Sequence, residues 1–561
     1  MSAAAVQVTV PPVATGPLRR LLPRRADYTD LRRSWPRDLA AGVTVAIVAL
    51  PLALAFGVAT GVGASVGLVT AVVAGAVAAV FGGSSLQVSG PTGAMTVVLV
   101  PLVAERGPAV VYPVAVLAGG IVIAAALLRA GRLLGYVPWP LIEGFTVGIA
   151  VVIAAQQVPA ALGVDRPEVE NAAAGAALAL GRFVTAPHWT VVGLLLLAVV
   201  LTAGLPRLHR SLPGSLVAVA VVTVVAGVTG ADVATIGSLP TGLPVPALPD
   251  LGGLGGLIGP ALAVAFLAAL ESLLSARVAD GMTDAPRSDA DRELLGQGLA
   301  NLASGICGGM PATGAIARTA VNARAGARTR LAALTHAVLL AGVVYGAAGL
   351  VGRIPLVALA GVLLVTAWRM VERHTVRAVL TSTRGDALVF ALTAVATVAL
   401  DLVTAVAVGM ALAVVVAVAR MAATTRTVPV EVSSPEVDGD VEHDLLTRHV
   451  LAYRIDGPLF FATVSRFLAE VTATADVRVV ILRLSAVALL DASGARALGE
   501  VVEDLAERGI TVLVKGASPE HLRLLDAVGT LQPLVDRGHV FADLPAAVAH
   551  ALHHVSTTAA R

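Results

Sequence analysis

The sequence predicts a polytopic α-helical membrane protein with a small α/β domain at its C-terminal end. Three observations lead to this fold class. The 561-residue chain is 57% hydrophobic and 14% charged, with a mean hydropathy of +0.86, whereas soluble domains are about a quarter charged. Two near-identical Gly/Pro motifs interrupt the apolar part, and the composition changes abruptly after Arg426.

The apolar region divides into fourteen expected segments, and about 20 apolar residues suffice to cross a bilayer as a helix. The third and tenth segments are too short to cross, and each follows one of the Gly/Pro motifs. In order, the segments are 38–58, 63–81, 92–103, 110–128, 140–159, 188–205, 214–230, 258–278, 293–307, 313–323, 331–351, 355–368, 386–400 and 403–420.

Arginine placement predicts the orientation of these segments. An N-terminal arm, residues 1–37, is rich in arginine, and further arginines follow the even-numbered segments. Positively charged loops stay in the cytoplasm, which predicts a multi-pass protein of the plasma (inner) membrane with both termini cytoplasmic. The first apolar run begins late and continues as a full span, so it does not resemble a secretory signal peptide.

The two Gly/Pro motifs occupy equivalent places in the two halves of the apolar region. They are Gly90-Pro91-Thr92-Gly93-Ala94 and Pro311-Ala312-Thr313-Gly314-Ala315. Seven segments in each half place the second half upside down relative to the first, which predicts a 7+7 inverted repeat. Matching interrupted segments in such repeats indicate a binding site near the bilayer midplane.

Helices that begin at Thr92 and Thr313 would direct free N–H groups and positive dipole ends into that site, which favours an anion. Irregular backbone persists in a bilayer only where protein buries it or where it lines a cavity. The alternative is a pair of ordinary Pro/Gly kinks.

Two ionisable residues, Arg318 and Glu271, lie within expected apolar segments. Arg318 lies in the short tenth segment, where an unpaired arginine costs about 2.5–3.5 kcal/mol. Arg318 is a candidate for direct anion contact, because its planar guanidinium can bind two oxygens of one anion. The alternative is that its side chain extends outward to the cytoplasmic end of the segment. Glu271 lies deep in the eighth segment and is a candidate for proton coupling. The alternative for Glu271 is a permanent salt bridge with Arg318.

The change in composition after Arg426 completes the predicted division of the chain into four parts. These are the arm 1–37, a transmembrane domain 38–426, a linker 427–446 and a cytoplasmic domain 447–556. In the last, strands are expected at 449–455, 477–484 and 510–515, and helices at 462–472, 492–508 and 519–528. This alternation is typical of a small α/β domain.

Ser493 follows Asp491 at the expected start of the helix 492–508. A phosphate on Ser493 would be tolerated near the positive end of that helix, so Ser493 is a candidate regulatory site. The alternative is plain N-capping by Asp491 or Ser493.

Several classes of function are not expected. The soluble domain shows no catalytic grouping of acids, histidines or cysteines, so we predict no enzyme, no cofactor and no metal site. The single cysteine, Cys307, permits no intrachain disulfide. Lys/Arg runs interleaved with aromatic residues are absent, so nucleic acid is not an expected partner.

Three stretches carry a resemblance to a known family. Residues 270–280 (Leu-Glu-Ser-Leu-Leu-Ser-Ala-Arg-Val-Ala-Asp), 293–301 and 308–322 resemble the eighth to tenth segments of the SulP family of anion transporters, the sulfate permeases related to prestin and pendrin. The C-terminal domain resembles a STAS domain. The resemblance extends from about Trp35 to His550.

This resemblance implies a transporter with core and gate domains, an elevator-like motion and a homodimer assembled with help from the STAS domains. It also implies the anion site, between the third and tenth segments and beside the first. The residues that match the family's site are Phe56, Thr92, Gly93, Ala94, Ala317 and Arg318, and Glu271 matches an acid linked to proton coupling.

The chain also departs from the family pattern. Pro51-Leu52 stands where many members have Pro-Gln, and Ala317 replaces a common serine. The run from Gly90 to Thr96 resembles bicarbonate-type members, but those use sodium and lack the arginine, so Arg318 favours proton coupling or exchange.

We therefore expect secondary active transport of small inorganic or carboxylate anions in a lipid bilayer, by proton symport or anion exchange. Sulfate is the first choice, followed by bicarbonate and dicarboxylates. One alternative is a nucleobase permease of the same fold, which Arg318 and the STAS domain disfavour. The other is an anion-sensing membrane protein that signals through its STAS domain.

Overall fold

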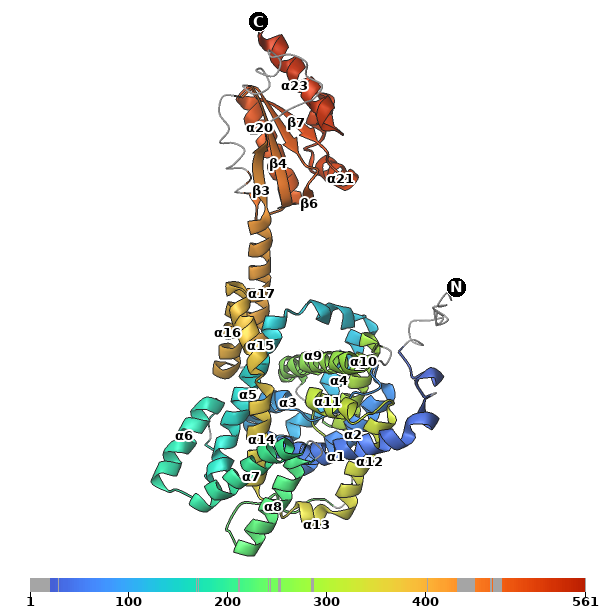
Figure 1. The fold of residues 1–561 in the computed structure, drawn as a ribbon, viewed down its shortest axis with the longest axis vertical. Coiled ribbons are helices and arrows are strands. Elements are labelled where there is room, and N and C mark those ends of the chain that lie inside the picture. Colours follow the sequence, from blue (N-terminus) through green and yellow to red (C-terminus); the bar gives the residue numbers. More distant parts are fainter. Residues whose placement is uncertain are drawn as a thin grey trace. The chain divides into compact units, whose positions relative to one another are not determined.

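The computed structural model describes residues 21–28, 30–167, 169, 171–209, 212–240, 242, 244–250, 254–283, 287–400, 402–430, 449–464, 467 and 477–559. Internal contacts divide the chain into two compact units, residues 1–411 and 412–561. Figure 1 labels most of the helices and several strands of these units.

A helix is found at each of the fourteen expected segments. Seven of the helices in the described part of the chain are long and apolar enough to cross a membrane. The fourteen are α1 (Leu31–Thr60), α2 (Ala64–Phe81), α3 (Gly93–Arg106), α4 (Val111–Leu127), α5 (Trp139–Leu162), α7 (Trp189–Leu208), α8 (Gly214–Thr229), α9 (Ile258–Met282), α10 (Ala290–Ile306), α11 (Ile316–Arg324), α12 (Leu331–Gly346), α14 (Leu356–Met370), α16 (Arg384–Ala399) and α17 (Leu402–Thr424).

Some helical structure lies outside the expected segments. Helix α1 begins at Leu31, so the end of the expected arm is already helical. Three further α-helices, α6 (Ala172–Thr185), α13 (Ala348–Val351) and α15 (Arg373–Ser382), lie in connections between expected segments or at their ends. Short 3₁₀ helices are η1 (Arg25–Tyr28), η2 (Pro108–Val110), η3 (Ala130–Tyr136) and η4 (Leu254–Gly256).

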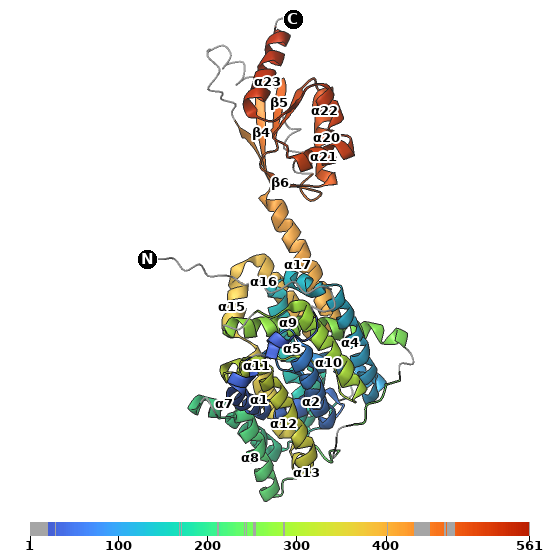
Figure 2. The same cartoon turned by 90° about the vertical axis from the view of Figure 1, so that its right-hand side faces the viewer.

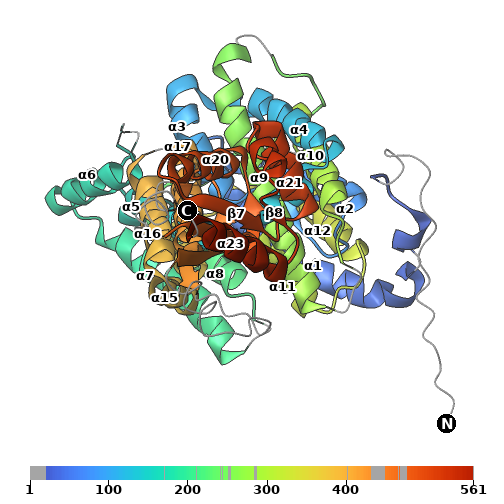
Figure 3. The same ribbon diagram turned by 90° about the horizontal axis from the view of Figure 1, so that it is seen from above.

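The helices of the first unit pack as two groups. One group contains α1, α2, α4 and α9–α12, and the other contains α5, α7, α8, α14 and α16. Helix α3 packs against α1 and α9 of the first group and α5 of the second, and α1 also contacts α14 and α8. Figures 1 and 3 show the two groups on opposite sides of the unit.

Glycines bring α4 and α10 into backbone contact. A Cβ added to Gly119 would lie 2.6 Å from the Leu302 nitrogen and 2.7 Å from the Gly298 oxygen. A Cβ on Gly305 would lie 2.7 Å from the Tyr112 oxygen. Because lipid offers no hydrophobic drive for helix association, such close packing through small residues holds membrane helices together.

We predict that Gly119→Ala destabilises the protein, because its methyl group would collide with the backbone of α10. Overpacking of this kind costs about 1–3 kcal/mol. Gly120→Ala is the matched control, since no atom lies within 4 Å of its added Cβ. Thermal unfolding in detergent should show a lower midpoint for the first variant alone, and equal midpoints would contradict this packing.

The second unit contains a mixed sheet in the order β3-β4-β5-β7-β8, with β6 also paired to β4. The β3–β4 pair is antiparallel, and the other pairs are parallel. The strands are β3 (Arg426–Val430), β4 (Val450–Leu459), β5 (Val479–Arg483), β6 (Val487–Leu490), β7 (Thr511–Lys515) and β8 (Val540–Phe541).

Helices cover both faces of this sheet. On one face, α20 (Ala492–Glu507), α21 (Pro519–Val528) and α22 (Gln532–Asp536) enclose a core that includes Val480 and Val512. On the other, α23 (Leu544–Ala559) packs against Ile481 and Leu513, as Figure 2 shows. Alternate residues of one strand therefore enter opposite cores, as the two-residue period of a strand requires.

The expected strands of this unit are found, and so are the expected helices at 492–508 and 519–528. The expected helix 462–472 lies mostly outside the described residues. One difference concerns the expected linker, because its first residues, Thr427–Val430, pair with β4 as part of strand β3. Pro429 suggested a linker, but β3 is an edge strand, where proline is tolerated.

Candidate functional site

The two Gly/Pro motifs meet in a short antiparallel ribbon. Strand β1 (Ser89–Gly90) pairs with β2 (Thr313–Gly314), so that Ser89 lies opposite Gly314 and Gly90 opposite Thr313. The Ala315 N–H also donates to the Val88 carbonyl, at 2.9 Å. Residues more than 200 positions apart are thereby joined at the point where both helices are interrupted.

The helix starts differ slightly from expectation. Helix α3 begins at Gly93 with Thr92 as its N-cap, as the first motif predicts. Helix α11 begins at Ile316, three residues after the expected start at Thr313. The physical reason is the ribbon, which holds Thr313 and Gly314 in extended conformation.

Side chains from α10 supply the hydrogen bonds that the broken backbone lacks. Asn301 donates to the Ala312 carbonyl at 2.9 Å and accepts from the Ala312 N–H at 2.8 Å. Gln297 donates to the same carbonyl at 2.8 Å and accepts from the Ser89 hydroxyl at 2.9 Å. Both side chains are completely buried, so irregular backbone inside the protein is satisfied without water.

The ribbon glycines permit very close approach. A Cβ added to Gly314 would collide with the side-chain amide of Gln87 and lie 3.0 Å from the Ser272 Cα. A Cβ added to Gly90 would lie 2.6 Å from Nη1 of Arg318. Glycine at these two positions leaves room for the side chains of Arg318 and Gln87.

Neither helix start carries a side-chain cap. The N-cap residues Thr92 of α3 and Ala315 of α11 make no capping hydrogen bond to the first turn. First-turn N–H groups have no partner inside their own helix, and together with the helix dipole they favour negative charge. Both N-cap residues are buried.

Glu271 of α9 connects the two motifs through its carboxylate. Its Oε2 accepts from the Thr313 hydroxyl at 2.6 Å and from the Thr92 hydroxyl at 3.0 Å. The carboxylate thus lies beside the N-cap of α3. Thr313 was not a site candidate in the sequence analysis, although it occupies the same place in the second motif as Thr92 does in the first.

Arg318 is the largest completely buried side chain in the described part of the chain, with 1% of its surface exposed. Its Nη2 donates to the Pro91 carbonyl, and its Nη1 is buried without a hydrogen-bond partner. The side chain therefore does not extend to the surface. Within the residues that the structure describes, it forms no ion pair with Glu271.

Of the remaining transport candidates, Phe56 and Ala94 lie around the start of α3, whereas Ala317 lies in α11. Phe56 of α1 is buried, and its Cε1 lies 3.5 Å from a Cβ placed on Gly93. Ile153 of α5 contacts the same point, and Ala94 is buried. Ala317 is exposed, in contrast to its neighbour Arg318.

A second buried acid, Glu293 at the start of α10, was missed by the sequence analysis. It accepts from the N–H groups of Gly83 and Ser84 at 2.8 and 2.9 Å and from Gln87 at 2.7 Å. These bonds hold the segment that leads into β1. The sequence contains no local signal for this role, because the partners lie about 210 residues away.

In the second unit, Ser493 is exposed in the first turn of α20. The cap of this helix is Asp491, which accepts from the Gly494 N–H at 2.7 Å and from the Phe461 N–H at 3.1 Å. Capping is therefore provided by Asp491, and the hydroxyl of Ser493 is accessible.

Paired helix breaks in a membrane unit are typical of the binding sites of secondary transporters. The chain matches the Sulfate permease family over residues 36–393 and the STAS domain over residues 445–547. It therefore belongs to the sulfate permease family of multi-pass anion transporters, which are not enzymes, and it carries a STAS domain.

Two of the similar proteins are named for different anions, and each matches most of the chain. "Putative sulfate transporter YvdB" of Bacillus subtilis is 34% identical over 527 residues, covering 91% of this chain and 96% of the relative. "Bicarbonate transporter BicA" of Synechocystis is 31% identical over 522 residues, covering 88% and 90%.

Solved structures agree on the fold. The structure of SLC26A9 matches with a TM-score of 0.81 at 16% identity and covers 94% of this chain and 92% of that one. The transmembrane domain of BicA matches with a TM-score of 0.60 at 33% identity, covering 68% and 98%. The membrane fold and the STAS domain predicted from the sequence are confirmed.

We predict that Asn301→Ala lowers stability by about 1–3 kcal/mol, because the buried N–H and carbonyl of Ala312 lose hydrogen-bond partners. Thr366→Ala is the control, since its hydroxyl donates to the Val362 carbonyl of its own helix, at 2.8 Å. Thermal unfolding of both variants in detergent provides the measurement. A midpoint for Asn301→Ala equal to that of the control would refute this role for Asn301.

Proposed function

We propose that this protein is a secondary active transporter of small anions, with sulfate as the first choice and bicarbonate or dicarboxylates next. Residues 38–426 are the transport domain in the plasma membrane, and the arm 1–37 and the STAS domain 447–556 are cytoplasmic. Residues 427–446 link the two domains, with Thr427–Val430 added to the STAS sheet as part of strand β3. The transporter works as a homodimer, and Ser493 is a site for regulatory phosphorylation.

One observation carries the proposal. Arg318 places a buried guanidinium, with Nη1 unpartnered, against the ribbon where two uncapped helix starts meet. A buried cation needs a partner, and the first turns of α3 and α11 add further donors for a negative group. A small oxyanion satisfies all of these donors at once. We assign Phe56, Thr92, Gly93, Ala94, Ala317 and Arg318 to this site.

Glu271 suggests how the anion is coupled to protons. The Glu271 carboxylate accepts a hydrogen bond from Thr92, which also belongs to the proposed anion site. When Glu271 is ionised, its negative charge repels an anion at that site and offsets part of the positive charge of Arg318. Protonation removes both effects. The proton and the anion therefore favour each other's binding, which is the thermodynamic requirement for symport.

The arrangement of helices supports an elevator-type movement. The site residues Arg318, Glu271 and Thr313 come from the group of α1, α2, α4 and α9–α12, with the start of α3 added. Ile153 of the other group contacts α3 at Gly93. Displacement of the first group against the second would carry the whole site with it, because the site lies almost entirely on one side.

The choice of anion rests on the relatives. One relative of more than 30% identity is named for sulfate and another for bicarbonate. Sulfate has more oxygens and more negative charge than bicarbonate for Arg318 and the two helix starts, and a relative is named for sulfate, so we place it first. Uptake into proteoliposomes from a panel of radiolabelled sulfate, bicarbonate, oxalate and uracil tests the proposal. Uracil uptake without anion uptake, or specific anion binding without any flux, would overturn it.

We predict that Arg318→Ala reduces sulfate uptake to the level of empty liposomes, because Arg318 is the one positive charge among the residues assigned to the site. Arg324→Ala is the matched control, since Arg324 ends the same helix and is exposed. Arg318→Lys keeps the charge but loses the two-oxygen fork, and we expect it to retain a small part of the activity. Each variant should elute as a single species before assay. Normal uptake by Arg318→Ala would contradict the assignment of Arg318 to the anion site.

We predict that Glu271→Gln abolishes the dependence of uptake on pH while sulfate still binds. In the parent protein, uptake should rise as the external pH falls, because proton binding and anion binding support each other. The amide keeps a hydrogen-bond acceptor for Thr92 and Thr313 but cannot titrate. Flux is measured with and without an imposed proton gradient, and binding is measured by isotope retention. A Glu271→Gln variant that still responds to the gradient would disprove this coupling.

A further inference from the structure

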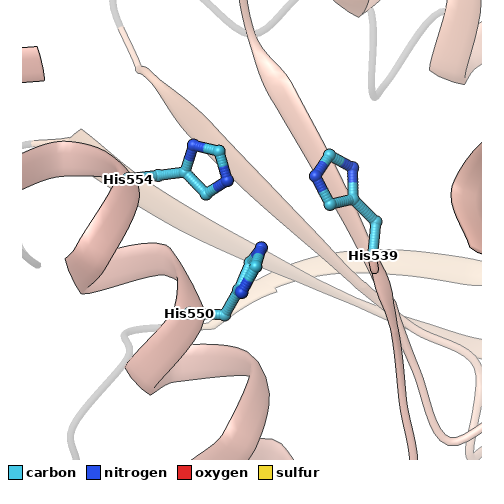
Figure 4. Close-up of side chains that lie close together, drawn as sticks. All are labelled: His539, His550 and His554. Carbon is cyan, nitrogen blue, oxygen red and sulfur yellow. The ribbon is translucent and has the colours of Figure 1, made fainter. Parts of the chain in front are cut away.

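Three histidines of the STAS unit converge in space. His539 directly precedes β8, and His550 and His554 lie one helical turn apart on α23. Figure 4 shows the three imidazole rings directed toward one another from the strand and the helix. One side-chain nitrogen from each ring lies within 4.8 Å of the others.

The geometry is close to that of a three-histidine metal centre. The ring centroids are 5.6 Å apart for His539 and His550, 5.7 Å for His539 and His554, and 4.9 Å for His550 and His554. Metal–nitrogen bonds of about 2.1 Å in a tetrahedral site place the ligand nitrogens about 3.4 Å apart. Small side-chain rotations would therefore close the site, without backbone movement.

The surroundings of His539 and His550 keep these two imidazoles available as ligands. Burial, followed by the neighbouring His550, His554 and Arg537, lowers the pKa of His539 to about 4. Burial and the adjacent His554 and His553 also lower the pKa of His550. The neutral imidazole is the form that binds metals.

The hydrogen bonds of His550 and His539 are also consistent with metal binding. His550 Nε2 is buried and has no hydrogen-bond partner in the described part of the chain, which leaves it free to bind an ion. His539 makes a hydrogen bond with the backbone of Val512. Metal-binding histidines commonly use their second nitrogen in this way, which fixes the orientation of the ring.

We propose that His539, His550 and His554 bind one divalent transition-metal ion of the zinc type, with a fourth position open to water. The cluster contains three imidazoles and no carboxylate. Imidazole ligands suit zinc, copper, nickel and cobalt rather than magnesium or calcium. The sequence analysis predicted no metal, although His550-x₃-His554 is a spacing that places two histidines on one face of a helix. The third ligand comes from another element and is recognisable only in the fold.

Such an ion would connect α23 to the edge of the sheet. Helix α23 otherwise packs through apolar residues, among them Ala547, Ala551 and Val555. Metal binding to the folded state alone stabilises that state. The expected consequence is slower amide hydrogen exchange in residues 544–559 when zinc is present.

The test uses the full-length protein in detergent, purified without a polyhistidine tag and stripped with a chelator. Cobalt(II) titration should give ligand-field absorption that saturates at one ion per chain and disappears when zinc is added. His550→Ala and His539→Ala should each weaken zinc binding at least about tenfold. His553→Ala is the matched control, because His553 lies on the same helix but is exposed and outside the cluster.

Two results would overturn the proposal. One is the absence of stoichiometric cobalt or zinc binding at micromolar concentrations. The other is equal binding by the parent protein and the His550→Ala and His539→Ala variants. Because a variant that fails to fold would also lose binding, each one is first checked for an unchanged circular dichroism spectrum and elution volume. Hydrogen exchange in residues 544–559 that zinc leaves unchanged would refute the predicted link to α23.

Discussion

The antiparallel pairing of Ser89–Gly90 with Thr313–Gly314 is the contact on which the membrane unit depends. It lets two interrupted helices satisfy each other's backbone where no water is available. It also sets both helix starts and brings the Thr92 and Thr313 hydroxyls to the same carboxylate oxygen of Glu271. Arg318 is held against the ribbon by the Pro91 carbonyl. Without this pairing, none of these groups would share one place.

The ribbon in turn depends on a shell of small and amide side chains. Gly90 and Gly314 leave space for Arg318 and Gln87, and a Cβ added to either glycine would collide with these side chains. Asn301 and Gln297 of α10 hold Ala312 from the side. Helix α10 is itself positioned by backbone contact with α4 at Gly119. The high content of glycine and alanine is therefore a requirement of close packing rather than a neutral feature of an apolar sequence.

The sequence alone determined the class of fold and most of its elements. The low charge and the long apolar runs predict the helices, because transfer to lipid depends mainly on composition. The positions of the arginines predict the orientation of these helices in the membrane. The repeated motifs predict that residues 90–94 and 311–315 are equivalent, and the motif around Asp491 predicts the start of α20. Arg318 and Glu271 are recognisable because buried charge is rare in a membrane.

Only the tertiary structure decided how these residues are connected. The sequence allowed a salt bridge between Arg318 and Glu271, whereas the fold gives Glu271 two threonines and Arg318 a backbone carbonyl. The delayed start of α11, the role of Glu293 and the meeting of His539 with His550 and His554 were likewise decided by contacts between distant segments. Local patterns reveal burial and periodicity, but the partner of a buried polar group depends on which elements pack together, and that is a property of the whole fold.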